Sequence, residues 1–298
     1  MSERKSFHLS QEFYSNSTVT LNCERLEAAL ETLQGFAPTE NTPLLELNIQ
    51  VFECIASTNQ TLWNLINTGA KAGTVVIASQ QTAGRGQWGR QWQSSQGGLY
   101  LSLAYDPKIL ASQQAQLTLC SAWGIATILR DYDIPVRLKW PNDLILTERK
   151  LGGILTETKV SNGQIIQAVI GVGINWANSI PETGINLQTY LAQSPDPPRV
   201  YSLEMLAALI LQGLRIGLWQ LSTVGIESLL KSYSQLLTCI GSQVKVAQRC
   251  GVIVGVNANG ELRVMLKPDD ANKAQEICIE PGKISLGYGS EESFHIKT

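Results

Sequence analysis

The stretch RLKWPNDLILTERKLGG (Arg137–Gly153) decides the fold prediction, because its pattern alternates, turns and alternates again. Val136, Leu138 and Trp140 alternate with two cationic residues, which predicts a strand with one apolar and one charged face. The residues PND turn the chain, LIL forms a returning strand, and ERK turns the chain once more. An antiparallel meander is therefore expected here.

Further strands are predicted on both sides of this meander, at Ile49–Cys54, Thr74–Ala78, Leu99–Tyr105, Leu151–Thr158 and Ile165–Asn175. Amphipathic helices are predicted between or after them, at 58–66, Ala115–Arg130, Ser202–Leu221 and Ile226–Leu237, and Ser57, Thr58 and Asn59 are residues suited to capping the first. We therefore expect an α+β catalytic domain over residues 48–238, with a mixed, mainly antiparallel central sheet and flanking helices.

The two ends of the chain differ from this domain in their predicted secondary structure. Residues 1–47 predict a partly ordered N-terminal extension with one helix at Glu24–Leu33, too short for the paired helices of a helix-turn-helix. Residues 239–298 contain only short strands, and Asn259-Gly260 is a strong hairpin signal. A small C-terminal β-barrel domain is expected.

Composition narrows the chemistry. The chain of 298 residues is 44% hydrophobic and 16% charged with a net charge of −2, which gives no global attraction to nucleic acid or membrane. We found no run of about 18 apolar residues and no signal peptide. The six cysteines are scattered, as in a reduced cytoplasmic protein. The two histidines lie near the chain ends, which argues against a Ser-His-Asp triad or a histidine-rich zinc site.

The segment QQTAGRGQWGRQW (Gln80–Trp92) carries the densest set of functional groups. Its glycines let backbone amides approach a ligand, its two arginines suit phosphate or carboxylate, and its tryptophans offer planar faces. The spacing Gly84-x-Gly86-x-x-Gly89 also imitates a dinucleotide-binding fingerprint, but QWQSSQGG after it is a poor helix former. A plain glycine-rich surface hairpin is the other alternative.

Two further constellations stand beside this loop. Lys139, Asn142, Asp143 and Lys150 are placed at hairpin ends on one side of the sheet. The segment GVGIN (Gly171–Asn175) puts two glycines inside an apolar strand, which is typical of a close approach by ligand or backbone.

Taken together, GRGQWGRQW, KWPNDL, RKLGGIL and GVGIN resemble the biotin protein ligases in order and spacing, over residues 51 to about 290. The resemblance implies a class II synthetase-like catalytic domain and an SH3-like C-terminal barrel. It also implies that biotin is activated with ATP, with Mg²⁺ as the accompanying cation, to biotinyl-5′-AMP. Biotin is then transferred to a lysine of the biotin carboxyl carrier protein of acetyl-CoA carboxylase.

The resemblance also implies roles for single residues. Ser57, Thr58, Asn59, Gln81, Arg85, Gly86, Gln87, Lys150, Gly153 and Gly171 are expected to bind biotin. Arg85, Arg90, Trp92, Lys139, Asn142, Lys150 and Asn175 are expected to bind ATP, with Trp92 and Asn142 at the adenine. Lys150, Arg85 and Asp143 are the catalytic candidates, Asp143 as a base for the carrier lysine or a helper for magnesium. No set of protein metal ligands is predicted.

The chain departs from the family pattern where Gln87 replaces a frequent arginine, which predicts weaker retention of biotinyl-AMP. Because residues 1–47 do not look like a DNA-binding module, a monofunctional ligase is expected, without nucleic-acid or membrane partners. A lipoate protein ligase, a non-catalytic biotin sensor and a nicotinamide dehydrogenase are the alternatives. Some relatives pair through edge strands, so the sequence leaves homodimerisation open.

Overall fold

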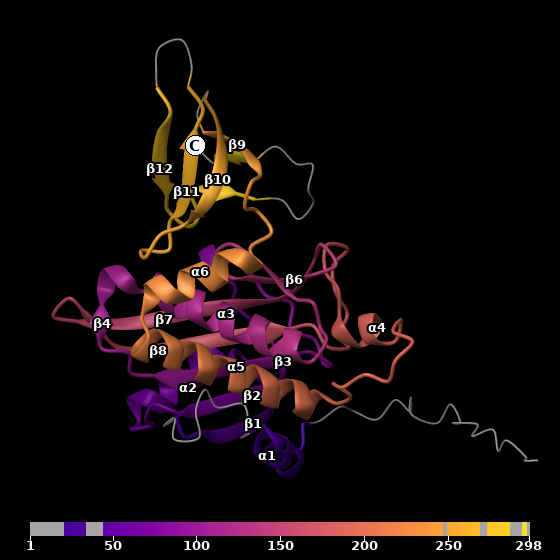
Figure 1. The fold of residues 1–298 in the computed structure, drawn as a ribbon. Helices are drawn as coiled ribbons and strands as arrows, with labels where there is room; N and C mark the ends of the chain where they lie inside the picture. The colour runs from indigo at the N-terminus through magenta and orange to yellow at the C-terminus, as the bar shows by residue number, and fades with distance from the viewer. Residues whose placement is uncertain (1–20, 34–43, 247–248, 269–272, 287–293, 297–298) are drawn as a thin grey trace, which may run out of the picture.

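The computed structural model describes residues 21–33, 44–246, 249–268, 273–286 and 294–296, which form a large α/β body and a smaller β domain (Figure 1). The large sheet contains β1 (Asn48–Ile55), β2 (Thr74–Gln81), β3 (Leu99–Tyr105), β4 (Ile109–Leu110), β5 (Arg137–Lys139), β6 (Asp143–Leu146), β7 (Arg149–Ser161) and β8 (Gln164–Ile174). The described helices are α1 (Cys23–Thr32), α2 (Thr58–Asn67), α3 (Ala115–Asp131), α4 (Leu187–Leu191), α5 (Leu203–Thr223) and α6 (Ile226–Leu236).

The strand order of the large sheet is β1-β2-β3-β8-β7-β6-β5, with β4 beside β8. The pair β1–β2 is parallel, and the other described pairs of this sheet are antiparallel. The prediction of a mixed, mainly antiparallel sheet is therefore confirmed. The meander predicted from Arg137–Gly153 corresponds to β5, β6 and the start of β7.

Helices cover both faces of this sheet, and the strand alternation shows which helix covers which face. In β2, Val75 and Ile77 belong to the large hydrophobic core with α3 and α5, whereas Val76 belongs to a small cluster with Leu62 and Ile66 of α2. Successive strand residues point to opposite faces, so α2 lies on the face opposite α3 and α5. Figure 1 shows α3, α5 and α6 together across one side of the sheet.

The expected N-terminal extension contributes to this core. Leu26 and Leu33 are fully buried, and α1 packs on α5. The backbone N–H of Asn22, the N-cap of α1, donates to Glu204 of α5 at 3.1 Å. Residues 21–33 are thus part of the large α/β body, while the rest of the predicted extension up to residue 43 lies outside the described residues.

Helix α5 is long and apolar enough to cross a membrane by length and composition, with a mean hydropathy of 1.3. The run of apolar residues in the sequence alone did not predict such a helix. However, 67% of this helix window is buried within the protein, against α1 and α3. Gly124 of α3 contacts the α5 backbone so closely that a Cβ atom would overlap the carbonyl of Gly213. The apolar surface of α5 is therefore that of a core helix.

The small domain has the strand order β12-β11-β10-β9-β14-β13. Its strands are β9 (Gln243–Val246), β10 (Arg249–Val256), β11 (Leu262–Leu266), β12 (Gln275–Ile279), β13 (Ile284–Ser285) and β14 (Phe294–Ile296). The predicted hairpin at Asn259-Gly260 joins β10 and β11. It docks on the large body, because the indole N–H of Trp140 donates to the carbonyl of Gly260 at 2.8 Å.

Candidate functional site

The glycine-rich segment after β2 is a loop that leads into a strand. One 3-10 turn (Gln87–Gly89) interrupts it, and the next strand is β3. The loop closes on itself because Gly86 N–H donates to the carbonyl of Arg90 at 2.7 Å. A dinucleotide fingerprint needs a helix at this point to receive the pyrophosphate, so the nicotinamide alternative is excluded.

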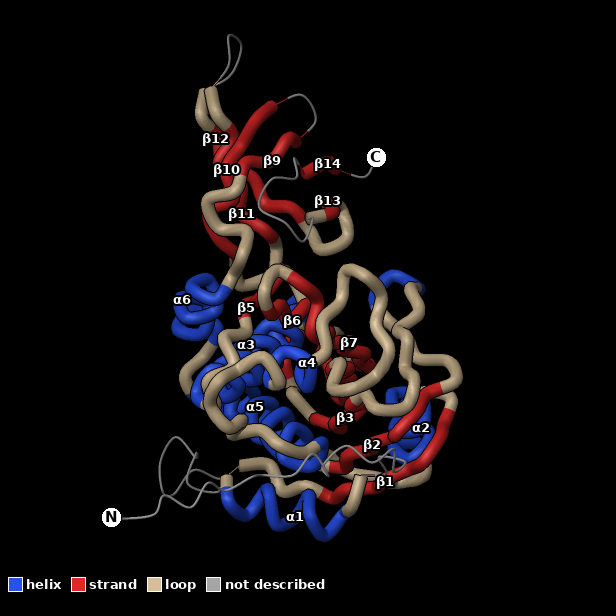
Figure 2. The backbone as a smooth tube through the Cα atoms, turned by 90° about the vertical axis from the view of Figure 1, so that its right-hand side faces the viewer, coloured by secondary structure: helices blue, strands red, loops and turns tan. Residues whose placement is uncertain are grey.

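A cavity of about 700 Å³ opens between this loop, the N-terminus of α2 and strands β5 to β8. Gly282, Ile284 and Leu286 of the small domain also line it. Figure 2 shows β13 on the side of the small domain that faces the loops of the large body. Every predicted site residue except Asn175 lines this cavity, so the structure brings the three sequence constellations together.

The strand register explains why the sheet is open here. On β8, Val169 lies under α2, and Gly171 and Gly173 follow it at two-residue intervals on the same face. A Cβ on Gly171 would overlap the side chain of Asn59, and a Cβ on Gly173 would come within 2.5 Å of the Trp92 indole nitrogen. The two glycines therefore make room for groups that reach over the sheet, as the pattern GVGIN predicted.

One end of the cavity is a polar network. The Gln81 side-chain oxygen accepts from the Thr58 backbone N–H at 2.8 Å and from the Thr58 hydroxyl at 3.2 Å. The Gln81 amide nitrogen donates to the Ser94 hydroxyl at 2.8 Å. Ser57 is the N-cap residue of α2, as the sequence suggested, but its side chain makes no capping hydrogen bond. These side chains serve the cavity instead.

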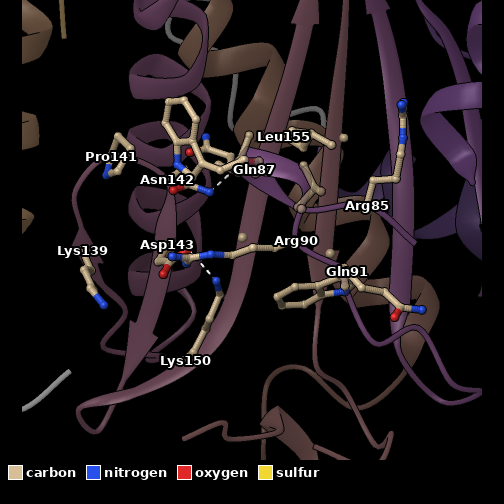
Figure 3. A pocket seen from close by; sticks show the side chains of 18 of the residues that line it. Arg85, Gln87, Arg90, Gln91, Lys139, Pro141, Asn142, Asp143, Lys150 and Leu155 are labelled. Carbon is tan, nitrogen blue, oxygen red and sulfur yellow. Dashed lines mark hydrogen bonds and ion pairs between the residues drawn. The ribbon is translucent and has the colours of Figure 1, made fainter. Parts of the chain in front are cut away.

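The other end of the cavity is charged. Lys150 Nζ lies 2.7 Å from Asp143 Oδ1, an ion pair that Figure 3 shows. The same nitrogen lies 5.2 Å from the centre of the Trp92 ring. Asp143 pairs across the sheet with Lys139 on one side and Gly153 on the other. Directly opposite residues share a face, so Lys139 lies on the same face of the sheet as the Asp143 carboxylate. Lys150 reaches that carboxylate through its ion pair, and the cavity lining as a whole carries more cationic than acidic side chains.

Asn142 is fixed at the turn between β5 and β6. Its side-chain amide donates to the carbonyl of Ile154 at 2.9 Å, and the Ile154 N–H donates back to the Asn142 carbonyl at 3.1 Å. Behind it, the hydroxyl of the fully buried Tyr233 donates to the carbonyl of Pro141 at 3.2 Å. Burial raises the pKa of Tyr233 well above its usual value, which keeps this hydroxyl a donor.

The two loop arginines take different directions. The Arg85 guanidinium is bound to Glu157 at 2.7 and 2.8 Å, with about 43% of the Arg85 side chain exposed. Figure 3 shows Arg85 pointing away from the Asp143–Lys150 pair, whereas Arg90 extends toward the side on which that pair lies. Arg90 is therefore the loop cation directed at the charged end.

Asn175 departs from its predicted place. It is buried behind Lys150, donates through its side chain to the Lys150 carbonyl at 3.3 Å, and accepts from Asn178 at 3.1 Å. Asn175 does not line the cavity with the other predicted residues, and its side chain supports the backbone that carries Lys150.

Sequence reasoning missed several residues of the site, which are Ser102, Glu157, Gly282, Ile284 and Leu286. Glu157 had a signal, since it is a lone carboxylate two residues beyond the apolar Leu155 on the face of the strand that carries Gly153. The small-domain residues had none, because their place in the cavity depends on how the two domains dock.

Comparison with known proteins gives a consistent picture. Residues 51–175 match the model of the biotin/lipoate A/B protein ligase family. The bifunctional ligase/repressor BirA of Salmonella typhimurium is 34% identical over 248 residues, which is 80% of this chain and 74% of that protein. BirA of Bacillus subtilis is 34% identical over 158 residues, which is 51% of this chain and 49% of BirA, so the match spans about half of that relative.

Among solved structures, the biotin protein ligase of Aquifex aeolicus in complex with biotin and ATP superposes with a TM-score of 0.63. The match covers 84% of this chain and 99% of that one at 24% sequence identity, which establishes a shared fold.

Proposed function

Because the chain belongs to the biotin protein ligase family, we propose that it activates biotin with ATP and transfers it to a lysine of a carboxyl carrier protein. The observation that carries the proposal is one cavity with two chemically different ends. A network of neutral side chains suits an uncharged ring, and the Lys139, Asp143 and Lys150 cluster suits a carboxylate meeting a phosphate.

In the first step, a carboxylate oxygen of biotin attacks the α-phosphorus of ATP, and the bond to the β-phosphate breaks. Biotinyl-5′-AMP forms and pyrophosphate leaves. Negative charge on the phosphoryl oxygens is stabilised by fixed cations, and Lys150 is the best placed of them. Asp143, at 2.7 Å, holds the ammonium in position.

In the second step, the amine of the carrier lysine attacks the carbonyl carbon of the mixed anhydride, and the bond to AMP breaks. The amine must lose a proton on the way to the amide. Asp143 is the carboxylate at this end of the cavity, so we assign it as the acceptor once AMP draws Lys150 toward its phosphate.

Magnesium is proposed to arrive with ATP. Among the described residues, no group of three or more His, Cys, Asp or Glu side chains is placed to hold a metal ion. ATP phosphates bind Mg²⁺ themselves with few protein ligands, so the residues present fit a substrate-borne cation.

We also propose that this chain acts without a DNA-binding role, although the relatives above are ligase/repressors. The net charge of −2, which gives no global attraction to a polyanion, supports this. A gel-shift titration with biotin and ATP present tests it: retardation of DNA at micromolar protein would contradict it.

The transfer reaction is the direct test of the proposed function. Labelled biotin, ATP and magnesium are incubated with the protein and a carboxyl carrier domain, beside a carrier whose target lysine is replaced by arginine. ATP-dependent label on the lysine carrier alone is expected. Label from lipoate in place of biotin would identify a lipoate ligase, and tight biotin binding without transfer would identify a sensor.

A further inference from the structure

We propose that Glu157 is a specificity-determining residue, which acts through Asn59 and Ser102 to make the polar end of the cavity accept hydrogen bonds. The inference rests on the proposed function and adds to it a reason for choosing a ring with N–H groups.

A relay of hydrogen bonds runs from Glu157 through Asn59 and Ser102 to Thr58, and it begins at the Glu157 carboxylate. Glu157 lies on β7, and its Oε2 accepts from the Asn59 side-chain amide at 2.8 Å. An ionised carboxylate only accepts, so the amide nitrogen of Asn59 must face Glu157 and its oxygen must face the opposite way. The carbonyl of Leu155, 3.4 Å from the same nitrogen, favours the same orientation.

The next member is a fully buried hydroxyl. Ser102 Oγ lies 2.6 Å from the side-chain oxygen of Asn59 and 2.8 Å from the hydroxyl oxygen of Thr58. A serine has one hydroxyl proton, and the Asn59 oxygen can only accept, so Ser102 donates to Asn59. The proton of Ser102 is therefore not available to Thr58 or to a ligand.

The last member faces the cavity. Because Ser102 donates its proton to Asn59, the Thr58 hydroxyl has two acceptors nearby. These are Ser102 Oγ at 2.8 Å and the Gln81 side-chain oxygen at 3.2 Å. In either case its own proton stays inside the protein. Thr58 lines the cavity, so a ligand meets an oxygen lone pair there. The ureido ring of biotin carries N–H donors, whereas the dithiolane ring of lipoate carries none, so this end discriminates between the two.

Glu157 has a second partner, and the experiment must separate the two roles. The Arg85 guanidinium binds both carboxylate oxygens, at 2.7 and 2.8 Å. Glu157→Gln removes the negative charge and so weakens the pairing with Arg85. Its amide oxygen can still accept from Asn59, because the reverse orientation would turn the amide nitrogen toward two donors, the Asn59 amide and the Arg85 guanidinium. Glu157→Met has similar length and removes the acceptor altogether. The pair of variants therefore isolates the relay.

The test measures biotin and lipoate binding by calorimetry without ATP, for the wild type, Glu157→Gln, Glu157→Met, Ser102→Ala and the Glu157→Met/Ser102→Ala double variant. We expect Glu157→Met and Ser102→Ala each to weaken biotin binding about tenfold, which is the scale of one lost hydrogen bond. Both variants should also lower the ratio of biotin affinity to lipoate affinity. The biotin affinity of Glu157→Gln should stay within about threefold of that of the wild type. The double variant should be no weaker than the worse single variant, because both changes break one relay.

Equal losses in Glu157→Gln and Glu157→Met would show that the pairing with Arg85 matters rather than the relay, and would overturn the inference. Additive losses in the double variant, or unchanged biotin affinity in Ser102→Ala, would overturn it as well. Ser102 lies on β3 and Glu157 lies on β7. Ser102→Ala therefore tests the relay even if Glu157→Met does not fold. Failure of the wild type itself to bind biotin would instead refute the proposed function.

Discussion

Replacing Lys150 by alanine is the most informative single change in the charged end of the cavity. Its ammonium contacts Asp143 Oδ1 at 2.7 Å and lies over the Trp92 ring at 5.2 Å. Lys150→Ala removes the cation and leaves the nearly buried Asp143 carboxylate facing the place where we expect the phosphates of ATP. The variant thus changes a neutral pair into a negative charge.

Two effects add to the magnitude. Loss of one preorganised charge-stabilising donor lowers the rate by about a hundredfold or more. A carboxylate about 4 Å from a phosphoryl oxygen adds a repulsion of up to about 4 kcal/mol at an effective dielectric constant near 20. We therefore expect adenylation to fall by at least about a hundredfold. The double variant Lys150→Ala/Asp143→Asn should recover about tenfold in adenylation rate, because it also removes the carboxylate that repels the phosphates.

The assay is biotin-dependent release of pyrophosphate at saturating ATP, before any carrier is added. Lys159→Ala is the matched control, because Lys159 lies exposed on the same strand β7. Its rate should equal that of the wild type. Pyrophosphate release by Lys150→Ala within about threefold of the wild type would refute the role given to Lys150 here, since the predicted loss is about a hundredfold.

Three further outcomes are expected. Gly173→Ala places a Cβ 2.5 Å from the indole nitrogen of Trp92 and so displaces the ring expected to pack on adenine. ATP affinity measured by calorimetry should therefore fall by about tenfold or more, and an unchanged affinity would contradict the position assigned to Trp92. Gln87→Arg adds a cation to the loop, so trapped biotinyl-AMP should dissociate more slowly in a filter-binding chase; an equal or faster rate opposes this. Burial raises the thiol pKa of Cys120 to about 12 and of Cys239 to about 11, which lowers their thiolate fraction at pH 8. The four exposed cysteines alone should therefore react with a thiol reagent in the native protein, and six fast-reacting thiols would contradict this.

The sequence predicted the sheet well because its strands alternate clearly. Leu138 and Trp140 are buried and the intervening Lys139 lines the cavity, as the alternation required. Leu99–Tyr105 has the predicted bounds. By contrast, β12 was missed, since its residues QEICI are half polar and its pattern depends on pairing with β11.

Long-range contacts explain the remaining differences. No local pattern in α1 shows that Leu26 and Leu33 would be buried against a helix some 180 residues later, which the Asn22–Glu204 hydrogen bond spans. The motif of Asn175 gave no sign that its side-chain amide would donate to the carbonyl of Lys150, which lies 25 residues earlier in the chain. Glu157 was overlooked because its partners come from two other segments of the chain.

The central claim is that this cavity joins biotin to AMP, and isotope exchange between pyrophosphate and ATP measures that step most directly. Labelled pyrophosphate, ATP and magnesium are incubated with the protein, with biotin, with lipoate, or with neither, and without a carrier. The account predicts label in ATP only when biotin is present. Exchange that depends on lipoate, or no exchange with biotin at all, would contradict it.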